Sequence, residues 1–305
     1  MLVFSPNVYH KAHIIAGFEA GKHVFSEKPL ATTLADCAAI AQAHRKSGRL
    51  FATGFVLRFS PIYRKAKEIL DSGRLGRIIS IDANENITPA HGGYIMQNWR
   101  RLTRLAGPHL LEKCCHDLDL INWYIGSVPT RVAGFGGLDL FVPKNRVLEK
   151  RYGRALFQTW PDHHRVGQSP FTTDKDILDN SVAILEYRNR VRVMFQATMS
   201  NAIPERRLYF SCTEGNLVLE LYTSSLRYRS LGDEAETVFD FKTGGHGGGD
   251  QVIWKELFRS MERGTKPLCG GDEGLESAVA ALAIDTSIRT GRLVNLEPIW
   301  KKLGR

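Results

Sequence analysis

A lysine at the end of an apolar segment is the first residue that could do chemistry. Lys28 stands between Glu27 and Pro29, directly after the strand-like run 23–26. Open α/β sheets bind their ligands at the carboxyl ends of parallel strands. An ammonium group placed there could hydrogen-bond a reacting hydroxyl or carbonyl and stabilise a developing alkoxide. The alternative is an exposed lysine on a loop between a strand and a helix.

The second group is a carboxylate and an imidazole spaced by four residues. Glu112 and His116 fall within an expected helix over 107–125, where they and Asp119 would share one face. A carboxylate one turn from a histidine can orient the ring and raise its basicity, which suits proton transfer near neutral pH. A purely structural buried histidine with a carboxylate partner is the alternative.

The five cysteines could bind metal or form disulfides. Zinc binding by Cys114, Cys115 and His116 would need adjacent residues that point in different directions on a helix, and no second ligand pair is evident. We therefore expect no metal. An odd number of cysteines in a long chain favours free thiols in a reducing compartment. Because no run approaches the roughly 18 apolar residues of a membrane span, we expect a cytoplasmic protein with no membrane partner.

A glycine-rich segment, 244–249, precedes Asp250 and has His246 at its centre. It matches the phosphate-binding pattern G-x-G-x-x-G poorly, because Asp250 occupies the place of the last glycine. A flexible turn with Asp250 as the N-cap of the next helix explains the segment equally well. His246 could still reach a nearby site.

The formal net charge of +9 raises the question of a nucleic-acid partner. The basic residues are spread along the chain, and no long basic run is interleaved with aromatic residues. This distribution favours a solvated basic surface, or one that attracts phosphorylated cofactors and anionic substrates, over a nucleic-acid site.

The elements that must position these residues fall into two groups. Residues 1–55 alternate short apolar runs with segments of helical spacing, which predicts parallel strands joined by right-handed crossovers. They resemble only the C-terminal part of an α/β Rossmann-type sheet. Helices are expected at 60–72 and 107–125. A strand is expected at 77–86, with a polar loop between this strand and the second helix.

Residues 56–305 read as an α+β domain with an open-faced, mainly antiparallel sheet. Its candidate strands alternate apolar and polar residues, as half-exposed antiparallel strands do; they are 131–135, 181–187, 191–200, 207–211, 217–221 and 237–241. The polar stretch 142–179 is expected to be a long loop that could cover a site. Two helices, 250–263 and 273–290, are expected to close the chain.

These features occur together in the Gfo/Idh/MocA family, named for glucose-fructose oxidoreductase, inositol 2-dehydrogenase and rhizopine catabolism oxidoreductases. The resemblance covers essentially the whole chain. The residues that carry it are Ser5-Pro6-Asn7 with His10, 21–24 running into 27–31, Arg58-Phe59, 112–119 with Trp123, Asp179-Asn180, the His246 glycine loop and Gly291-Arg292.

The resemblance implies an NAD(P)-dependent dehydrogenase that moves a hydride between nicotinamide C4 and a secondary alcohol carbon of a sugar, polyol or inositol-like substrate. Lys28 would match the catalytic lysine and His116 the general acid/base. Glu112 stands where inositol-dehydrogenase-like members have aspartate, so the carboxylate that orients substrate and histidine is kept and moved by about one methylene. A non-enzymatic sugar sensor or regulatory relative is the alternative.

The family pattern also implies which residues bind ligands. Those expected to border the nicotinamide end of NAD or NADP are Ser5, Pro6, Asn7, His10, Glu27, Lys28 and Arg58. Those expected to contact substrate are Trp99, Arg100, Glu112 and His246, with specificity coming from the loops around Trp99, 162–164 and His246. The peptide before Pro29 is expected to be cis.

The sequence departs from the family pattern at its start. Members begin with a strand and a G-x-G-x-x-G turn that binds the pyrophosphate, and this fingerprint is absent here. We expect that on the order of 70 to 90 residues precede the chain in a complete member, at roughly 30 per βαβ unit, and that the chain alone binds dinucleotide weakly or not at all. An open sheet face predicts a homodimer or homotetramer.

Overall fold

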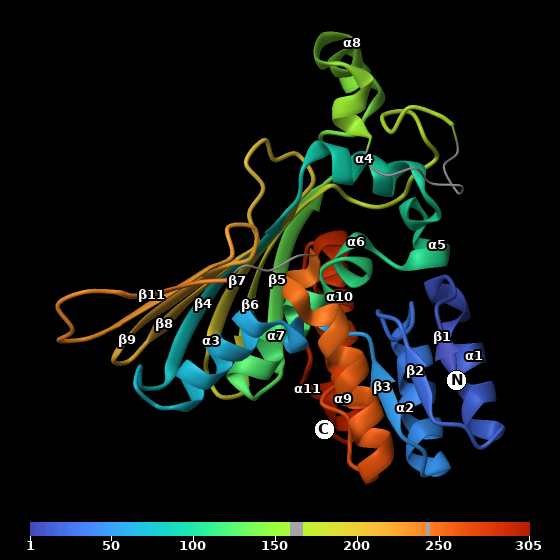
Figure 1. Cartoon of the computed structure of the whole chain (residues 1–305). Coiled ribbons are helices and arrows are strands. Elements are labelled where there is room, and N and C mark those ends of the chain that lie inside the picture. The colour runs from blue at the N-terminus through green and yellow to red at the C-terminus, as the bar shows by residue number, and fades with distance from the viewer. Residues whose placement is uncertain (159–166, 242–244) are drawn as a thin grey trace.

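The N-terminal residues form a small parallel sheet. The computed structural model describes residues 1–158, 167–241 and 245–305 (Figure 1). Strands β1 (Leu2–Val3), β2 (Val24–Ser26) and β3 (Phe51–Thr53) pair in parallel in that order, and α1 (His10–Glu19) and α2 (Leu34–Ser47) connect them. This confirms the α/β character predicted for residues 1–55.

A nine-stranded sheet forms most of the remainder. Its order is β11-β10-β9-β8-β4-β7-β6-β5-β12, and every neighbouring pair is antiparallel except β4 with β7. The predicted open, mainly antiparallel sheet is therefore confirmed, although β10 and β12 were not expected. The strands are β4 (Ile78–Asn86), β5 (Pro129–Gly137), β6 (Asn180–Tyr187), β7 (Arg192–Thr198), β8 (Arg207–Cys212), β9 (Gly215–Glu220), β10 (Ser225–Ser230), β11 (Thr237–Asp240) and β12 (Val294–Asn295).

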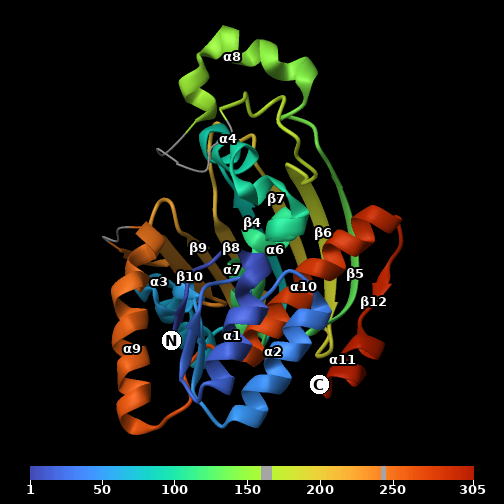
Figure 2. The ribbon, with the colours of Figure 1, turned by 90° about the vertical axis from the view of Figure 1, so that its right-hand side faces the viewer.

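Helices cover one face of the large sheet and leave the other open. The covering helices are α3 (Pro61–Asp71), α7 (Cys115–Ile125) and α10 (Gly271–Thr290), as Figures 1 and 2 show. Along β6 the side chains alternate between buried and exposed, as a sheet with one covered face requires. On the open face Phe135, Ile184 and Met194 are each more than half exposed.

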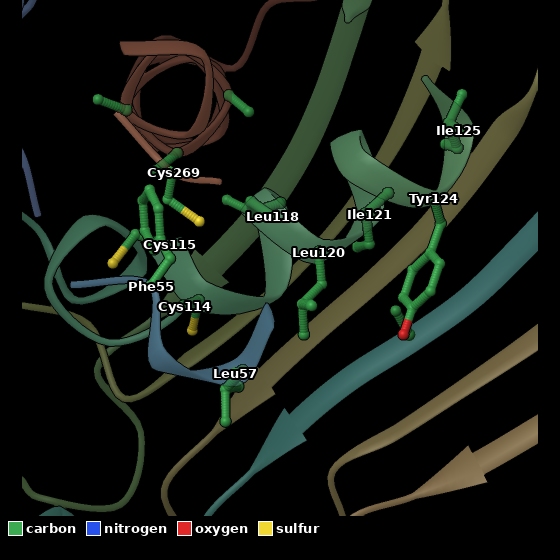
Figure 3. Packing of buried hydrophobic residues seen from close by; sticks show 14 of the residues in the cluster. Phe55, Leu57, Cys114, Cys115, Leu118, Leu120, Ile121, Tyr124, Ile125 and Cys269 are labelled. Atoms are coloured by element: carbon green, nitrogen blue, oxygen red, sulfur yellow. The ribbon is translucent and has the colours of Figure 1, made fainter. Parts of the chain in front are cut away.

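One hydrophobic core joins the parallel sheet to the large sheet. Helix α10 packs against α2 and β3 on one side and against β5 on the other. Helix α7 contributes Leu118, Ile121 and Tyr124 to this core, beside Phe55 and Cys269 (Figure 3). The division into two domains at residue 55 stays a prediction.

The predicted helix over 107–125 is wrong, because the chain breaks into α6 (His109–Glu112) and α7. In a continuous helix the Glu112 carbonyl would accept from the His116 amide. Here that carbonyl accepts a hydrogen bond from Lys28 Nζ at 2.7 Å. The break therefore places Glu112 and His116 on separate elements and makes a backbone acceptor available to the lysine.

The predicted long loop over 142–179 is also wrong in its described part. It contains α8 (Val147–Tyr152) and two 3-10 helices, Pro143–Arg146 and Arg154–Phe157, and it packs on α4 (Pro89–Gln97), another unexpected helix. Phe141, Phe157 and Phe171 form a second buried cluster, with neighbouring ring centroids 5.0 to 5.3 Å apart. Aromatic residues scattered through a polar stretch give no periodic signal, so the lobe is built by tertiary packing.

The remaining helices complete the chain. Helix α9 matches its prediction closely, whereas α11 follows α10 where no further helix was expected. The other helical segments are α5 (Thr103–Ala106), α9 (Gly249–Arg263), α11 (Glu297–Leu303) and the 3-10 helices Asn7–Tyr9, Val56–Phe59, Trp99–Arg101 and Gly245–Gly248. No helix in the part of the chain that the structure describes is long and apolar enough to cross a membrane.

Candidate active site

Lys28 lies at the carboxyl end of β2, where the strand-loop pattern predicted it. Its Nζ donates to the Glu112 carbonyl at 2.7 Å and lies 3.5 Å from Glu112 Oε1. Only 17% of the side chain is exposed, so the alternative of an exposed surface lysine is wrong. The Lys28–Pro29 peptide is cis, as expected.

The charge state of Lys28 follows from its neighbours. Burial lowers the pKa of the amine, but the nearby carboxylates, Glu112 first and then Glu27, act in the opposite direction, and the net pKa lies above its ordinary value. Lys28 is therefore an ammonium at neutral pH. It can donate hydrogen bonds and supply positive charge, and it cannot serve as a base.

Glu112 is held by two cations. Its Oε1 accepts from Arg100 Nε at 3.0 Å, in addition to its contact with Lys28. Burial raises the pKa of this carboxyl, but Lys28 and Arg100 outweigh that effect and bring the pKa down to about 2. Glu112 is thus a carboxylate at any physiological pH.

Arg100 links this carboxylate to the predicted substrate residue Trp99. The guanidinium carbon lies 4.4 Å from the centre of the Trp99 ring, a cation–π contact. Its Nη1 also donates to Tyr94 Oη at 3.1 Å and to Asn98 Oδ1 at 3.0 Å. The structure therefore brings Lys28, Glu112, Arg100 and Trp99 together as one connected group.

His116 is buried, and its relation to Glu112 differs from the prediction. The Glu112 carboxylate bonds Arg100, and His116 Nδ1 is buried without a hydrogen-bond partner among the described residues. Burial, together with the charges of Lys28 and Arg206, lowers the pKa of His116 well below its usual range. The prediction that the Glu112 carboxylate orients the histidine is therefore wrong. The ring is held by packing, edge-on to Phe55 with the two ring centroids 5.9 Å apart, and it is neutral.

The strand-end loops are fixed by buried polar contacts. His10 Nδ1 lies 2.8 Å from the Pro29 carbonyl oxygen and Nε2 lies 2.9 Å from the Ser5 carbonyl oxygen, so the ring sits between the loop after β1 and the loop after β2. Burial lowers the pKa of His10, and this effect exceeds the increase caused by the two nearby carbonyls. The ring is therefore neutral and can donate a hydrogen bond to only one of them. Asn7 Nδ2 donates to the Ala106 carbonyl at 2.9 Å.

Three other predicted residues sit at this edge. The carboxylate of Glu27 lies over Gly54, where an added Cβ would stand 2.9 Å from Glu27 Oε2. Burial raises the pKa of this carboxyl. Ser5 and Pro6 form the loop after β1, and the Ser5 hydroxyl contacts His13 Nδ1 at 2.9 Å.

Arg58 lies apart from this group, in a buried ion pair. Its Nε and Nη2 donate to the two carboxylate oxygens of Asp119 at 2.7 Å each, and its guanidinium carbon lies 5.3 Å from the Trp123 ring centre. Only 5% of Arg58 is exposed. The ion pair braces the 3-10 helix Val56–Phe59 against α7, and the role of Arg58 beside the cofactor stays a prediction.

His246 approaches His116 from the glycine segment. The two ring centroids are 6.4 Å apart, and His246 Nδ1 contacts Asp250 Oδ1 at 3.0 Å. Asp250 is not the N-cap that was predicted, because α9 begins at Gly249 after Gly248 and Asp250 lies in its first turn. The specificity segment expected at 162–164 and the start of the glycine segment at 244 lie outside the described residues.

The sequence prediction missed a charged network around Asp117, the residue that follows His116. Arg206 donates to both oxygens of Asp117 at 2.8 Å each, and its Nε lies 2.6 Å from Glu85 Oε2. Lys113 Nζ lies 3.5 Å from Glu85 Oε1. The available signal was Asp117 and Asp119, two aspartates on an otherwise largely apolar helix, because buried carboxylates require cationic partners.

The described residues offer no metal centre. Among residues 1–158, 167–241 and 245–305, no three histidine, cysteine or acidic side chains are grouped so that they could hold an ion. The thiols of Cys114 and Cys115 are buried, and burial raises the pKa of both.

Two models of one oxidoreductase family match the chain. The model of the oxidoreductase family NAD-binding Rossmann fold matches residues 1–55, and that of the family's C-terminal alpha/beta domain matches residues 67–296. The chain belongs to the Gfo/Idh/MocA oxidoreductase family. This confirms the resemblance found in the sequence, and it makes the chain a member of a family of NAD(P)-dependent oxidoreductases.

Individual Gfo/Idh/MocA relatives are similar over different lengths. The oxidoreductase YteT of Bacillus subtilis (strain 168) is 25% identical, over 96% of this chain and 80% of that protein. Inositol 2-dehydrogenase 2 of Saccharopolyspora erythraea is 34% identical over 42% of this chain and 35% of that protein. A levoglucosan dehydrogenase solved with NADH and levoglucosan superposes with a TM-score of 0.80 at 19% identity, over 96% of this chain and 79% of that one, and this likeness shows the fold.

Proposed function

We propose that the protein oxidises a secondary alcohol of a sugar, polyol or inositol-like substrate with NAD or NADP. The observation that carries this proposal is the buried ammonium of Lys28, fixed at the carboxyl end of β2 by the Glu112 carbonyl. A positive charge held in a partly dry site stabilises an alkoxide as it forms. Relatives that include inositol and levoglucosan dehydrogenases support the substrate class.

The residues at the strand ends fit the nicotinamide end of such a cofactor. Asn7 and His10 fix the loop after β1, and Glu27 packs against Gly54, so polar groups and bare backbone meet at one edge of the sheet. This is the edge at which open α/β sheets bind nucleotides. A nicotinamide held at this edge would supply the acceptor for the hydride that leaves the alcohol carbon.

The protein's own groups would handle the proton and the orientation. His116 is neutral, so it can take the hydroxyl proton as the carbon–oxygen double bond forms. Lys28 donates a hydrogen bond to the same oxygen. Glu112, fixed by Arg100, accepts a hydrogen bond from a neighbouring hydroxyl, and Trp99 offers an apolar face to the ring of the substrate.

The test is reduction of NAD or NADP by the full-length protein over a panel of aldoses, polyols and inositols. We expect turnover with at least one compound, and a rate of oxidation that stays level through neutral pH. The rate should fall only as the pH drops well below 6.5, because the proton acceptor must be unprotonated and the pKa of His116 is depressed.

Two variants make this test specific. His116→Ala should lose most activity together with the acid limb of the profile. His23→Gln, which changes an exposed histidine at the amino end of β2, should retain both. The proposal fails if no compound reduces either cofactor, and the assignment of His116 fails if His116→Ala keeps the same acid limb.

We also propose that the open sheet face pairs two copies of the chain as a homodimer, alone or within a homotetramer. Ile184 and Met194 are cross-strand partners, 61% and 57% exposed, and they line a depression of about 710 Å³ together with Leu293. Contiguous apolar surface of this kind marks protein interfaces. The cross-strand position makes the two side chains one patch.

Placing charges in this patch should separate the copies. In size-exclusion chromatography with light scattering we expect the double variant Ile184→Asp, Met194→Asp to have half the wild-type mass, a monomer from a dimer or a dimer from a tetramer, since two buried carboxylates would face their own copies. Ile203→Asp changes a residue that is 86% exposed outside the strands and should keep the wild-type mass. A monomeric wild type, or dissociation of both variants alike, would contradict the proposed interface.

A further inference from the structure

A second histidine stands next to the proton acceptor of the candidate active site. The rings of His116 and His246 have their centroids 6.4 Å apart and are tilted by 42° to each other. His116 is 6% exposed, whereas the side chain of His246 is 55% exposed. One imidazole therefore lies inside the site and the other lies at its surface.

A proton that His116 accepts from substrate cannot remain there. Burial lowers the pKa of the ring, and so do the charges of Lys28, Arg206 and Lys113. Its Nδ1 is buried without a hydrogen-bond partner among the described residues, so none of them accepts a proton on that side. The proton must therefore leave from the other nitrogen, Nε2, before the next substrate molecule reacts.

The turn that carries His246 is held by its backbone. His246 has a φ of 50°, in the left-handed region that residues other than glycine seldom adopt. The carbonyl of the next residue, Gly247, accepts a hydrogen bond from the buried Ser60 hydroxyl at 2.8 Å, and a Cβ on Gly247 would collide with that oxygen. Because Ser60 directly precedes α3, this contact fixes the turn to the body of the protein and keeps His246 beside His116.

Asp250 determines which nitrogen of His246 is free. The Nδ1 atom of His246 lies 3.0 Å and 3.2 Å from the two carboxylate oxygens of Asp250. A carboxylate only accepts hydrogen bonds, so Nδ1 carries the ring proton and Nε2 has a lone pair. This second nitrogen can take up a proton from inside the site. The side chains of both residues are more than half exposed, so the pair can then release a proton to solvent.

We propose that His246, oriented by Asp250, relays the proton of the alcohol between His116 and solvent, an inference that rests on the proposed dehydrogenase function. The alcohol carbon gives its hydride to the nicotinamide acceptor of that reaction, and the hydroxyl proton passes to His116. It then crosses the gap between the two rings through one bridging water, reaches His246 Nε2 and leaves to bulk water. One proton is thus released for each alcohol oxidised. His246 acts through His116 and not on the reacting carbon.

Stopped-flow kinetics of His246→Asn give a direct test, in the full-length protein and with the compound of the panel that the wild type oxidises fastest. Asparagine tolerates the left-handed backbone and cannot take up a proton. We expect the first turnover to keep its wild-type rate, because His116 is unprotonated at the start. Later turnovers should slow by about 10²-fold, the lower end of the effect of a positioned proton-transfer group. Added imidazole should restore them in a saturable way and leave the wild type unchanged.

Two carboxylates of α9 provide a second variant and its control. Asp250→Asn should lose part of the same steady-state rate and regain it with imidazole, which keeps the test valid if His246→Asn fails to fold. Glu262→Gln, exposed in the last turn of α9, should behave as the wild type.

The possible outcomes separate the relay from the dehydrogenase function. A slow first turnover or a raised KM in His246→Asn that imidazole does not reverse would mean that His246 binds substrate, and would overturn the relay. Steady-state kinetics equal to the wild type would overturn it as well. Both results leave the dehydrogenase function standing, whereas a wild type that oxidises no compound would overturn the two proposals together.

Discussion

Replacing Lys28 by methionine is expected to lower kcat/KM for alcohol oxidation by about 10²- to 10⁴-fold, the range that removal of a positioned proton-transfer or electrostatic group produces. Methionine keeps an unbranched stem in the same space and removes the ammonium. The oxygen of the substrate would then carry developing negative charge without a cation beside it. Because this interaction grows in the transition state, kcat should fall more than KM rises.

The same substitution separates catalysis from folding. Glu112 would still be paired with Arg100, so no unpaired buried carboxylate is left behind and Tm should change little. Lys22→Met provides the control, since Lys22 is an exposed lysine just before the amino end of β2. Activity of Lys28→Met within a few-fold of the wild type would remove Lys28 from the mechanism, and an equal loss in Lys22→Met would point to general damage.

The position of Lys28 was predictable because it follows from local patterns. Alternating strands and helices over 1–55 require parallel pairing, and parallel strands bring their carboxyl ends to one edge. The period-two alternation along β6 likewise predicted a sheet with one open face. Both inferences rest on backbone geometry that short stretches of sequence determine.

The relation of Glu112 to His116 was not predictable in this way. The acceptor that a continuous helix would give to His116 is taken by Lys28, which lies 84 residues away. A tertiary contact therefore overrides helical spacing at the point where the two residues were expected to share a face. The described part of 142–179 illustrates the same limit, because Phe157 and Phe171 form a core only by packing with Phe141 and with Ile95 and Met96 of α4.

The partners of the buried charged residues could not be predicted from the sequence either. Asp119 pairs with Arg58, which is 61 residues away in the sequence, and Asp117 pairs with Arg206, which is 89 residues away. The spacing of residues shows which carboxylates fall on a largely apolar helix, but it does not show which cations pair with them. The two pairs matter for the site because both hold α7, the helix that carries His116.

Arg206→Met should be the most destabilising single substitution that we predict. Arg206 is 5% exposed; its guanidinium binds Asp117 and also contacts Glu85, which is fully buried. Removing one member of a buried ion network leaves uncompensated charge and costs about 3–5 kcal/mol. Lys113 would remain as the cation next to Glu85, at 3.5 Å, and cannot balance two carboxylates.

The neighbouring arginine provides a matched control. The free energy of unfolding of both variants is measured by urea denaturation, with the slope of that free energy against urea concentration held the same. Arg207 is the next residue and the first of β8; its side chain is 26% exposed and pairs with Asp82 at 2.7 Å. Because surface ion pairs contribute little, Arg207→Met should change the free energy of unfolding by less than about 1 kcal/mol. If the two variants lose equal stability, the network around Arg206 does not have the energetic role that its burial implies.

The pH dependence gives the loss of Arg206 a signature that simple loss of packing lacks. Burial already raises the pKa of Asp117, and without the guanidinium the pKa of this carboxyl should rise further. A carboxyl whose pKa is higher in the folded than in the unfolded protein destabilises the fold above that pKa, and the penalty disappears as the pH falls through it. The deficit of Arg206→Met should therefore be larger in mildly alkaline than in mildly acidic buffer, whereas a cavity left by a missing side chain would cost the same in both.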